Sequence, residues 1–188
     1  NLYGELRAVD ISTSYYPNPQ FYYTAGEIPK LEFSISCTTR RPRGQEENAK
    51  DYYFITPDEF RQKIDNDDFV EFEEVYTDKF YGTLKQEIDR IWSSGNVVIF
   101  DVDVKGGIAL KKYFKEQALS IFIMPPSVEE LEKRLFGRAT DDEDTIKIRL
   151  EKAEEELAHK HLFDTIVVND DLEDAKLKIS SLVNDFIS

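Results

Sequence analysis

Apolar and polar positions follow two regular patterns along the chain from residue 31 onward. Continuous apolar runs, which are typical of strands buried on both faces of a sheet, occur at 96–103, 119–127 and 163–170. Elsewhere apolar positions recur every three or four residues, which predicts helices at 83–95, 127–138, 142–160 and 171–187. Strands that alternate with helices predict an α/β domain with a mostly parallel sheet.

Apolar positions have a shorter spacing in residues 33–83 than in the predicted helices. The stretch 69–76 alternates with period two over most of its length, and short strand patterns occur at 31–36 and 51–55. Thr56 and Pro57 follow, and together they predict a capped helix start. We therefore expect a β-rich insert within the α/β domain.

Residues 1–30 differ in composition from the rest of the chain. They contain five of the ten tyrosines but only five charged residues, and the prolines at 17, 19 and 29 interrupt any long helix. The stretch 14–23 is typical of irregular chain or short edge strands. We treat 1–30 as an atypical segment in front of the α/β pattern.

The charge balance restricts the partners of the chain. With 24 Lys+Arg against 38 Asp+Glu, the 188 residues carry a formal net charge of −14, which argues against nucleic acid or an anionic membrane as a partner. No apolar run reaches the roughly 18 residues of a membrane span. The single cysteine, Cys37, rules out a disulfide within the chain and a cysteine-based zinc site, so we expect a cytoplasmic location. Any anion must bind at a local cluster of Arg or Lys.

One such cluster stands in SISCTTRRPRG, at 34–44. It combines hydroxyl side chains with arginines: Ser36, Thr38, Thr39, Arg40, Arg41 and Arg43. The planar guanidinium fork suits a phosphate, and hydroxyls and loop N–H groups complete such a site. The alternative is that these arginines pair with the abundant glutamates at the surface, and the segment alone favours neither interpretation.

Four side chains of the β-rich insert could contact a nucleotide. Tyr52 and Tyr81 offer phenol donors to a phosphate, while Glu71 and Thr83 offer an acceptor and a hydroxyl to a purine edge with N–H donors, as guanine has. The alternative is an ordinary half-buried hairpin.

Asp101 and Asp103 end the apolar run 96–103. Ligands of open α/β sheets collect at the carboxyl ends of the strands, so these carboxylates predict contacts to a ligand or to the waters of a magnesium ion. The alternative is that they cap a loop.

Arg134, Arg138 and Arg149 lie on or beside two predicted helices joined by GRAT, at 137–140. Mobile helices that carry arginines supply charge in phosphoryl transfer and exclude water. The alternative is surface salt bridges to nearby glutamates. His159 and His161 are interpreted as surface residues, because no metal-binding motif surrounds them.

Taken together in order and spacing, several motifs resemble guanylate kinase of the bacterial type, from about Leu31 to the C-terminus. They are SISCTTRRPRG, DYYFITPDEF, FVEFEEVY, FYGTLK, IFDVDVKGG, PPSVEELEKRL, GRAT and VVNDDLE. The resemblance implies a P-loop nucleoside monophosphate kinase fold with a GMP-binding region at 33–92, a core at 96–126 and 163–188, and a short helical lid at 127–150. It also implies transfer of phosphate from ATP to GMP with Mg²⁺, by a monomer or small homo-oligomer.

The resemblance further implies roles for individual residues. The GMP phosphate would contact Ser36, Arg40, Arg43, Tyr52 and Tyr81. The guanine edge would be read by Glu71, Thr83 and Asp103. The ATP side would involve Arg134, Arg138, Arg149 and Asn169. Catalysis would depend on Arg40, Asp101, Arg138 and Arg149.

The chain departs from the family pattern in two places. Ala139 stands in the lid where the family usually has glycine, and residues 1–30 contain no phosphate-binding loop of the form GxxxxGK[ST]. Three explanations stay open: residues 1–30 are wrongly joined to the rest, the chain binds GMP without turnover, or it is a phosphopeptide-binding module. The predicted lid arginines argue against the third, because a phosphopeptide receptor has no use for an ATP clamp.

Overall fold

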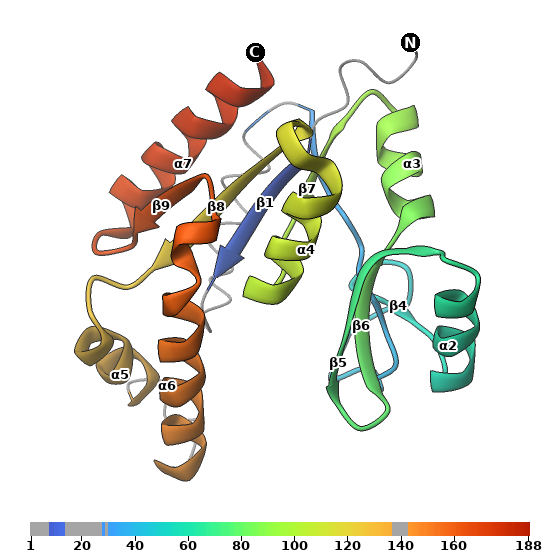
Figure 1. The fold of residues 1–188 in the computed structure, drawn as a ribbon, viewed down its shortest axis with the longest axis horizontal. Coiled ribbons are helices and arrows are strands. Elements are labelled where there is room, and N and C mark those ends of the chain that lie inside the picture. The colour runs from blue at the N-terminus through green and yellow to red at the C-terminus, as the bar shows by residue number, and fades with distance from the viewer. Residues whose placement is uncertain (1–7, 14–27, 29, 137–142) are drawn as a thin grey trace.

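The computed structural model describes residues 8–13, 28, 30–136 and 143–188 (Figure 1). Its centre is a five-stranded sheet in the order β2 (Leu31–Phe33), β7 (Val97–Phe100), β1 (Ala8–Thr13), β8 (Ala118–Met124) and β9 (Thr165–Val168). All pairings in this sheet are parallel. The predicted α/β class is therefore confirmed.

Strand β1 lies in the middle of this sheet, although the sequence pattern did not predict it. Ala8 pairs with Val98 of β7 on one side and with Ala118 of β8 on the other. The segment AVDIST is short and carries polar residues, so it lacks the continuous apolar run that identifies the other central strands. The stretch 14–23 lies outside the described residues.

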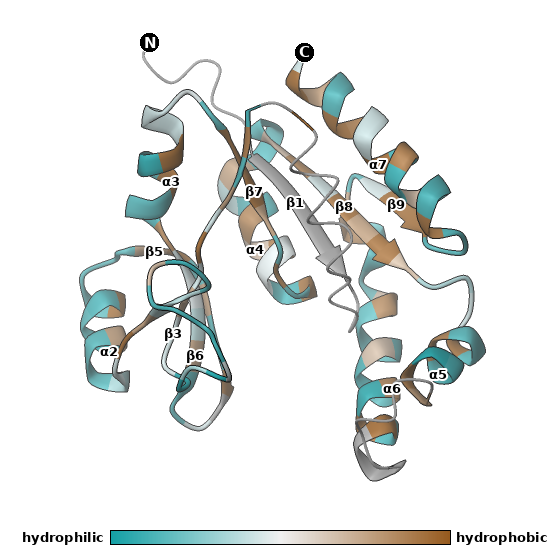
Figure 2. Cartoon of the chain, turned by 180° about the vertical axis from the view of Figure 1, so that it is seen from behind, coloured by the Kyte–Doolittle hydropathy of each residue, from teal (hydrophilic) through white to brown (hydrophobic). Residues whose placement is uncertain are grey.

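Helices cover both faces of the parallel sheet. Val98 packs in a cluster with α3 (Lys85–Ser93) and α4 (Val104–Phe114), whereas its neighbour Ile99 packs in another cluster with α7 (Leu172–Ile187). Successive side chains of a strand point to opposite faces, so this strand needs cover on both. Figure 2 shows β8 brown over most of its length, while α7 alternates between brown and teal, as expected of a helix with one face on the core.

A second, smaller sheet lies beside the first. Its order is β4 (Tyr53–Phe54), β3 (Cys37–Thr38), β6 (Lys79–Leu84) and β5 (Phe69–Tyr76). Strands β5 and β6 form an antiparallel hairpin, and β3 joins β6 to β4. This sheet is the β-rich insert that the sequence predicts.

Helix α2 (Pro57–Asp65) packs on the small sheet. It begins with a capping box between Thr56 and Glu59, which confirms the predicted helix start. Its Phe60 is fully buried and stacks on Phe69 and Phe80, with ring centroids 4.4 Å and 5.0 Å apart. These three rings form the centre of the insert's own core.

Helices α5 (Val128–Phe136) and α6 (Glu143–Ala158) lie on the opposite side of the parallel sheet from the insert (Figure 1). They pack on each other through a small cluster that includes Leu131 and Ile146. Residues 137–142, which include Arg138 and Ala139, are outside the described residues. Helix α6 continues past residue 150, where the sequence places the end of the lid.

Two short 3₁₀ helices, Lys115–Gln117 and Lys160–Leu162, complete the described elements. In the part of the chain that the structure describes, no helix has the length and apolar character to span a membrane.

Candidate functional site

Arg40 is the least exposed arginine of the predicted phosphate cluster. Its side chain is 8% exposed, and its guanidinium lies 4.6 Å above the centre of the Tyr52 ring. It donates to both carboxylate oxygens of Glu46, at 2.5 Å and 2.6 Å, and to the carbonyl of Arg41 at 3.1 Å. The backbone N–H of Arg43 donates to the same carboxylate at 2.7 Å. Arg40 therefore pairs with a glutamate, as the alternative interpretation expected. The pair is not at the open surface, because the guanidinium lies against an aromatic ring.

The two predicted tyrosines lie close to this arginine. The rings of Tyr52 and Tyr81 meet edge to face, with centroids 6.2 Å apart. Burial raises the pKa of Tyr52, an effect that Arg40 opposes and the charge of Asp101 reinforces, so the phenol keeps its proton as a donor. Ser36 directly precedes β3, which pairs with β4 and with the strand that carries Tyr81. The fold thus gathers these side chains at one part of the insert.

Glu71 and Thr83 form a cross-strand pair on the hairpin. Their backbones are opposite each other in the β5–β6 register, and the Thr83 hydroxyl donates to Glu71 Oε1 at 2.6 Å. Burial raises the pKa of Glu71 to about 7; the Thr83 hydrogen bond opposes this rise and the charge of Asp103 adds to it. Neighbouring Gly82 is required here, because a Cβ would approach the carbonyl oxygen of Glu71 to 2.8 Å.

Asp103 caps the helix that follows the parallel strand β7. It is the N-cap residue of α4, and its Oδ1 accepts from the N–H of Gly106 at 2.9 Å. Asp103 therefore caps a helix rather than a loop, and its charge also acts on Glu71 and Glu73 of the hairpin. Asp101 lies at the end of β7 and is exposed.

A cavity of about 210 Å³ opens between α4 and α6, beside Asp103. Its walls include Asp103, Lys105, Lys152, Glu156 and His159. Glu156 is 8% exposed, and burial raises its pKa to about 7 against the opposing charge of Lys152. Within the described residues its Oε2 has no hydrogen-bond partner. Lys105 of this cavity also pairs with Glu73 on β5 at 3.0 Å.

Arg134 and Asn169, both predicted for the ATP side, lie next to each other. Arg134 Nη1 donates to the carbonyl of Asn169 at 2.8 Å and Nη2 to that of Asp170 at 3.4 Å. The same side chain donates to Glu130 at 3.0 Å, so the salt-bridge alternative also occurs. Arg149 is half-buried on α6. The prediction for Arg138 lies outside the described residues.

Glu46 and Glu156 were not among the residues predicted from the sequence. Glu46 follows Arg43 by three residues, and an acidic residue so close to an arginine cluster is a signal for an ion pair. Glu156 follows the buried Ala153 by three residues on α6, so it lies on the apolar face of an amphipathic helix. Glutamates are rarely buried unless they are paired, and Lys152 lies 3.8 Å from Glu156 Oε1.

Arginines suited to an anion follow strand β3 of the small sheet, and an acceptor suited to N–H donors lies on its hairpin, beside a parallel α/β core. That arrangement suits a nucleoside monophosphate, and together with the parallel α/β core it matches the class of nucleoside monophosphate kinases. The family model for guanylate kinase matches residues 26–186. A guanylate kinase of Porphyromonas gingivalis is 53% identical over 158 residues, which cover 84% of each chain. One of Bacteroides fragilis is 49% identical over 165 residues, covering 88% of this chain and 81% of that protein. The chain therefore belongs to the guanylate kinase family.

A solved structure supports the same assignment. The crystal structure of guanylate kinase from Anaplasma phagocytophilum matches with a TM-score of 0.76 and 28% identity, covering 96% of this chain and 85% of that chain. This is a larger share of the chain than the residues matched by the family model. The predicted nucleoside monophosphate kinase fold is confirmed.

Proposed function

We propose that this chain transfers the terminal phosphate of ATP to GMP, as a guanylate kinase of purine nucleotide metabolism. The observation that carries the proposal is the Thr83–Glu71 pair, held at 2.6 Å on the small sheet whose strands β3 and β4 are flanked by Arg40 and by the Tyr52 ring beneath its guanidinium. A base acceptor and a phosphate cluster in the same insert can hold the two ends of one nucleotide.

Glu71 provides selectivity for guanine. The guanine edge presents two adjacent N–H donors, which a carboxylate can accept together. Adenine presents a lone pair at the equivalent ring nitrogen, so it would leave a buried acceptor without a donor, at a cost in binding. Thr83 orients the carboxylate, and Asp103 lies close enough for its charge to act on Glu71.

Arg40, Arg43, Ser36, Tyr52 and Tyr81 bind the GMP phosphate in this proposal. The phosphate is itself an anionic nucleophile at neutral pH, so the reaction needs neither a covalent intermediate nor a general base. The arginines reduce the repulsion between the acceptor phosphate and the phosphates of ATP. Positioning and charge neutralisation of this kind account for most of the rate in phosphoryl transfer.

The ATP phosphates contact arginines from α5, α6 and the segment between them. Arg134, Arg138 and Arg149 supply the positive charge, and the loop at Asn169 meets adenine. The Arg134 hydrogen bond to the Asn169 carbonyl supports this grouping, because it holds the arginine against the loop that follows β9.

Mg²⁺ fits this site as an ion bound together with ATP. Among the described residues, no group of three Asp, Glu, His or Cys side chains could hold a metal. Mg²⁺ in kinase sites commonly takes one or two carboxylates beside phosphates and waters, and Asp101 offers such a carboxylate at the exposed end of β7. When bound, the ion neutralises phosphate charge.

The nucleotide affinities test the proposal. Residues 1–30 contain no GxxxxGK[ST], the loop whose N–H groups and lysine hold phosphates in P-loop kinases. We therefore expect calorimetry to show GMP binding and only weak ATP binding. A coupled assay with ATP, GMP and Mg²⁺ should detect GDP, and GMP binding without any GDP would instead indicate a module that has lost turnover.

The phosphopeptide-binding alternative is not favoured, because the relatives that match most of this chain are guanylate kinases. We further propose that the chain acts in the cytoplasm, as a monomer or small homo-oligomer. Sedimentation of the purified chain tests the oligomeric state.

A further inference from the structure

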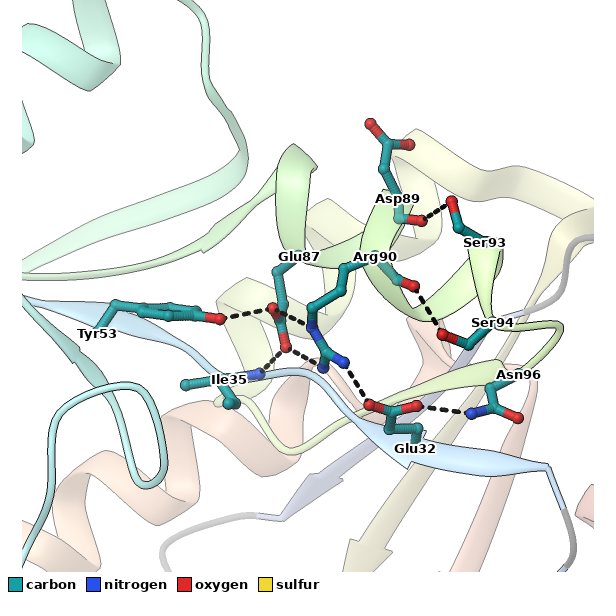
Figure 3. A network of polar contacts seen from close by, with 9 residues as sticks. All are labelled: Glu32, Ile35, Tyr53, Glu87, Asp89, Arg90, Ser93, Ser94 and Asn96. Atoms are coloured by element: carbon teal, nitrogen blue, oxygen red, sulfur yellow. Dashed lines mark hydrogen bonds and ion pairs between the residues drawn. The ribbon is translucent and has the colours of Figure 1, made fainter.

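The chain passes between its two sheets at two places, and both meet at Glu87 (Figure 3). The first passage is 34–36, which runs from β2 of the parallel sheet to β3 of the insert. The second is α3, which runs from β6 of the insert back to β7. Glu87 lies on α3, and its Oε1 accepts the backbone N–H of Ile35 from the first passage at 3.0 Å.

Glu87 is buried, and both of its oxygens are hydrogen-bonded. The residue is 2% exposed. Arg90 donates to it through Nε and Nη2, at 2.9 Å and 2.8 Å, and the phenol of Tyr53 donates to Oε2 at 2.9 Å. Hydrogen bonds to a buried, ionised carboxylate are stronger than those between neutral groups.

The network continues into the parallel sheet. Arg90 Nη1 donates to Oε1 of Glu32 on β2 at 2.6 Å, and the side-chain amide of Asn96 donates to the other oxygen of Glu32 at 2.6 Å. An unbroken path of hydrogen bonds thus runs from β2, through Arg90 and Glu87, to β4 of the insert (Figure 3).

Glu87 stays ionised at neutral pH. Burial is the largest single influence and raises its pKa, but the hydrogen bonds from Arg90, Ile35 and Tyr53 together outweigh burial and leave the pKa lowered. The carboxylate is therefore a charged acceptor for these hydrogen bonds at neutral pH.

Beside this network, the joint between the two sheets (residues 34–36 and helix α3) is not closely packed. A cavity of about 300 Å³ is lined by Cys37, Tyr53, Leu84, Glu87 and Arg90, among other residues. Where side chains interdigitate, packing alone fixes the relative position of two elements. Where a cavity replaces that packing, the relative position of the two sheets depends more on the hydrogen bonds of Glu87.

The residues that Glu87 holds are adjacent to the proposed phosphate contacts. Ile35 precedes Ser36, and Tyr53 follows Tyr52. We propose that Glu87 is a positioning residue for GMP, which with Tyr53 and Arg90 sets where Ser36 and Tyr52 stand relative to the rest of the site. This inference rests on the proposed binding of GMP by the insert.

Tyr53→Phe is the mildest test, because it removes one hydroxyl and keeps the ring. If the correctly positioned state is less populated, the apparent dissociation constant for GMP rises in proportion. We expect a rise of about tenfold, the lower end of the worth of one hydrogen bond to a charged group. Guanosine, which has no phosphate, should lose much less affinity, and calorimetry with both ligands measures the difference.

Arg61→Gln is the matched control. Arg61 lies on α2 of the same insert and pairs with Asp58 and Asp78, away from the joint between the sheets. It should leave GMP affinity unchanged. Glu87→Gln and Glu87→Ala extend the series, and Gln should retain more GMP affinity because its carbonyl can still accept one of the bonds.

The outcomes separate the inference from the proposed function. A loss confined to GMP supports positioning by Glu87. Equal losses for GMP and guanosine, or unchanged GMP affinity in folded Tyr53→Phe, would overturn it while leaving the proposed function intact. An unmodified chain that fails to bind GMP would overturn the proposed function itself.

Discussion

Arg40 and Glu46 form a bidentate ion pair in which Nη1 and Nη2 of the guanidinium donate to the two carboxylate oxygens at 2.5 Å and 2.6 Å. The hydrogen bonds from Arg40, with that from the Arg43 backbone, lower the pKa of Glu46 to about 2. The pair is therefore intact at neutral pH. By holding the end of the guanidinium fork, Glu46 orients Arg40 over the Tyr52 ring.

Glu46→Gln tests whether this orientation assists phosphate binding. A neutral amide cannot accept both N–H groups of the fork, so Arg40 loses part of its fixed orientation. We expect the dissociation constant for GMP to rise about tenfold, the scale of one hydrogen bond to a charged group. Glu47→Gln is the control, because that neighbouring carboxylate pairs with Lys50 instead. Tighter GMP binding by Glu46→Gln would show that Glu46 competes with the phosphate.

Glu71→Ala tests the guanine acceptor. The substitution removes hydrogen bonds to two N–H donors, so GMP affinity should fall by about 100-fold. IMP, which lacks the exocyclic amino group, should lose less, and AMP least. Competition binding with the three monophosphates measures the change. Equal losses for all three would remove Glu71 from base recognition.

The raised pKa of Glu71 predicts a pH dependence of GMP binding. Only the ionised carboxylate accepts both donors, and its pKa is about 7 in the free protein. GMP affinity should therefore increase as the pH rises from 6 to 8. The GMP phosphate also titrates near this range, with a second pKa of about 6. Glu71→Gln is the control. Its GMP affinity should still change with the titration of the phosphate, but the part of the pH dependence that comes from Glu71 should be lost.

The same carboxyl predicts a pH dependence of folding stability with the opposite sign. The folded-state pKa of about 7 lies above the ordinary value of 4.5, so between these values the folded state binds a proton that the unfolded state has released. The free energy of unfolding should decrease as the pH rises through this window and level off above it. Glu156, whose pKa is also raised to about 7, contributes in the same direction. Urea denaturation of Glu71→Gln and Glu156→Gln at several pH values should show flatter profiles, and profiles as steep as that of the unmodified chain would contradict this assignment.

Phe60→Ala tests the core of the insert. Phe60 is fully buried between two stacked rings, so its removal should lower the free energy of unfolding by about 3–5 kcal/mol. Leu177→Ala, at a site that is 69% exposed, should change it by less than about 0.5 kcal/mol. Urea denaturation measures both. A small effect at Phe60 would mean that the insert adds little to the measured stability.

Residues 96–103 and 119–127 show which structural elements a sequence pattern can predict. Their apolar runs predicted β7 and β8, because a strand covered on both faces must be apolar on both. Thr56 and Pro57 likewise predicted the start of α2, since a helix cap depends only on residues within one turn. Recognition of the family motifs supplied the candidate residues of the GMP site, including Glu71 and Thr83.

The tertiary structure decided what depends on contacts between distant segments. Strand β1 owes its central place to partners on both sides rather than to its own short and partly polar sequence. Ile35 and Glu87 are 52 residues apart in the chain, and no local pattern pairs them. The carboxylate of Glu87 contacts these partners only when the two sheets are packed next to each other. The sequence by itself therefore determined the family, the main elements and the candidate chemistry, whereas the folded chain determined which charges are buried together, because burial and pairing depend on the whole structure.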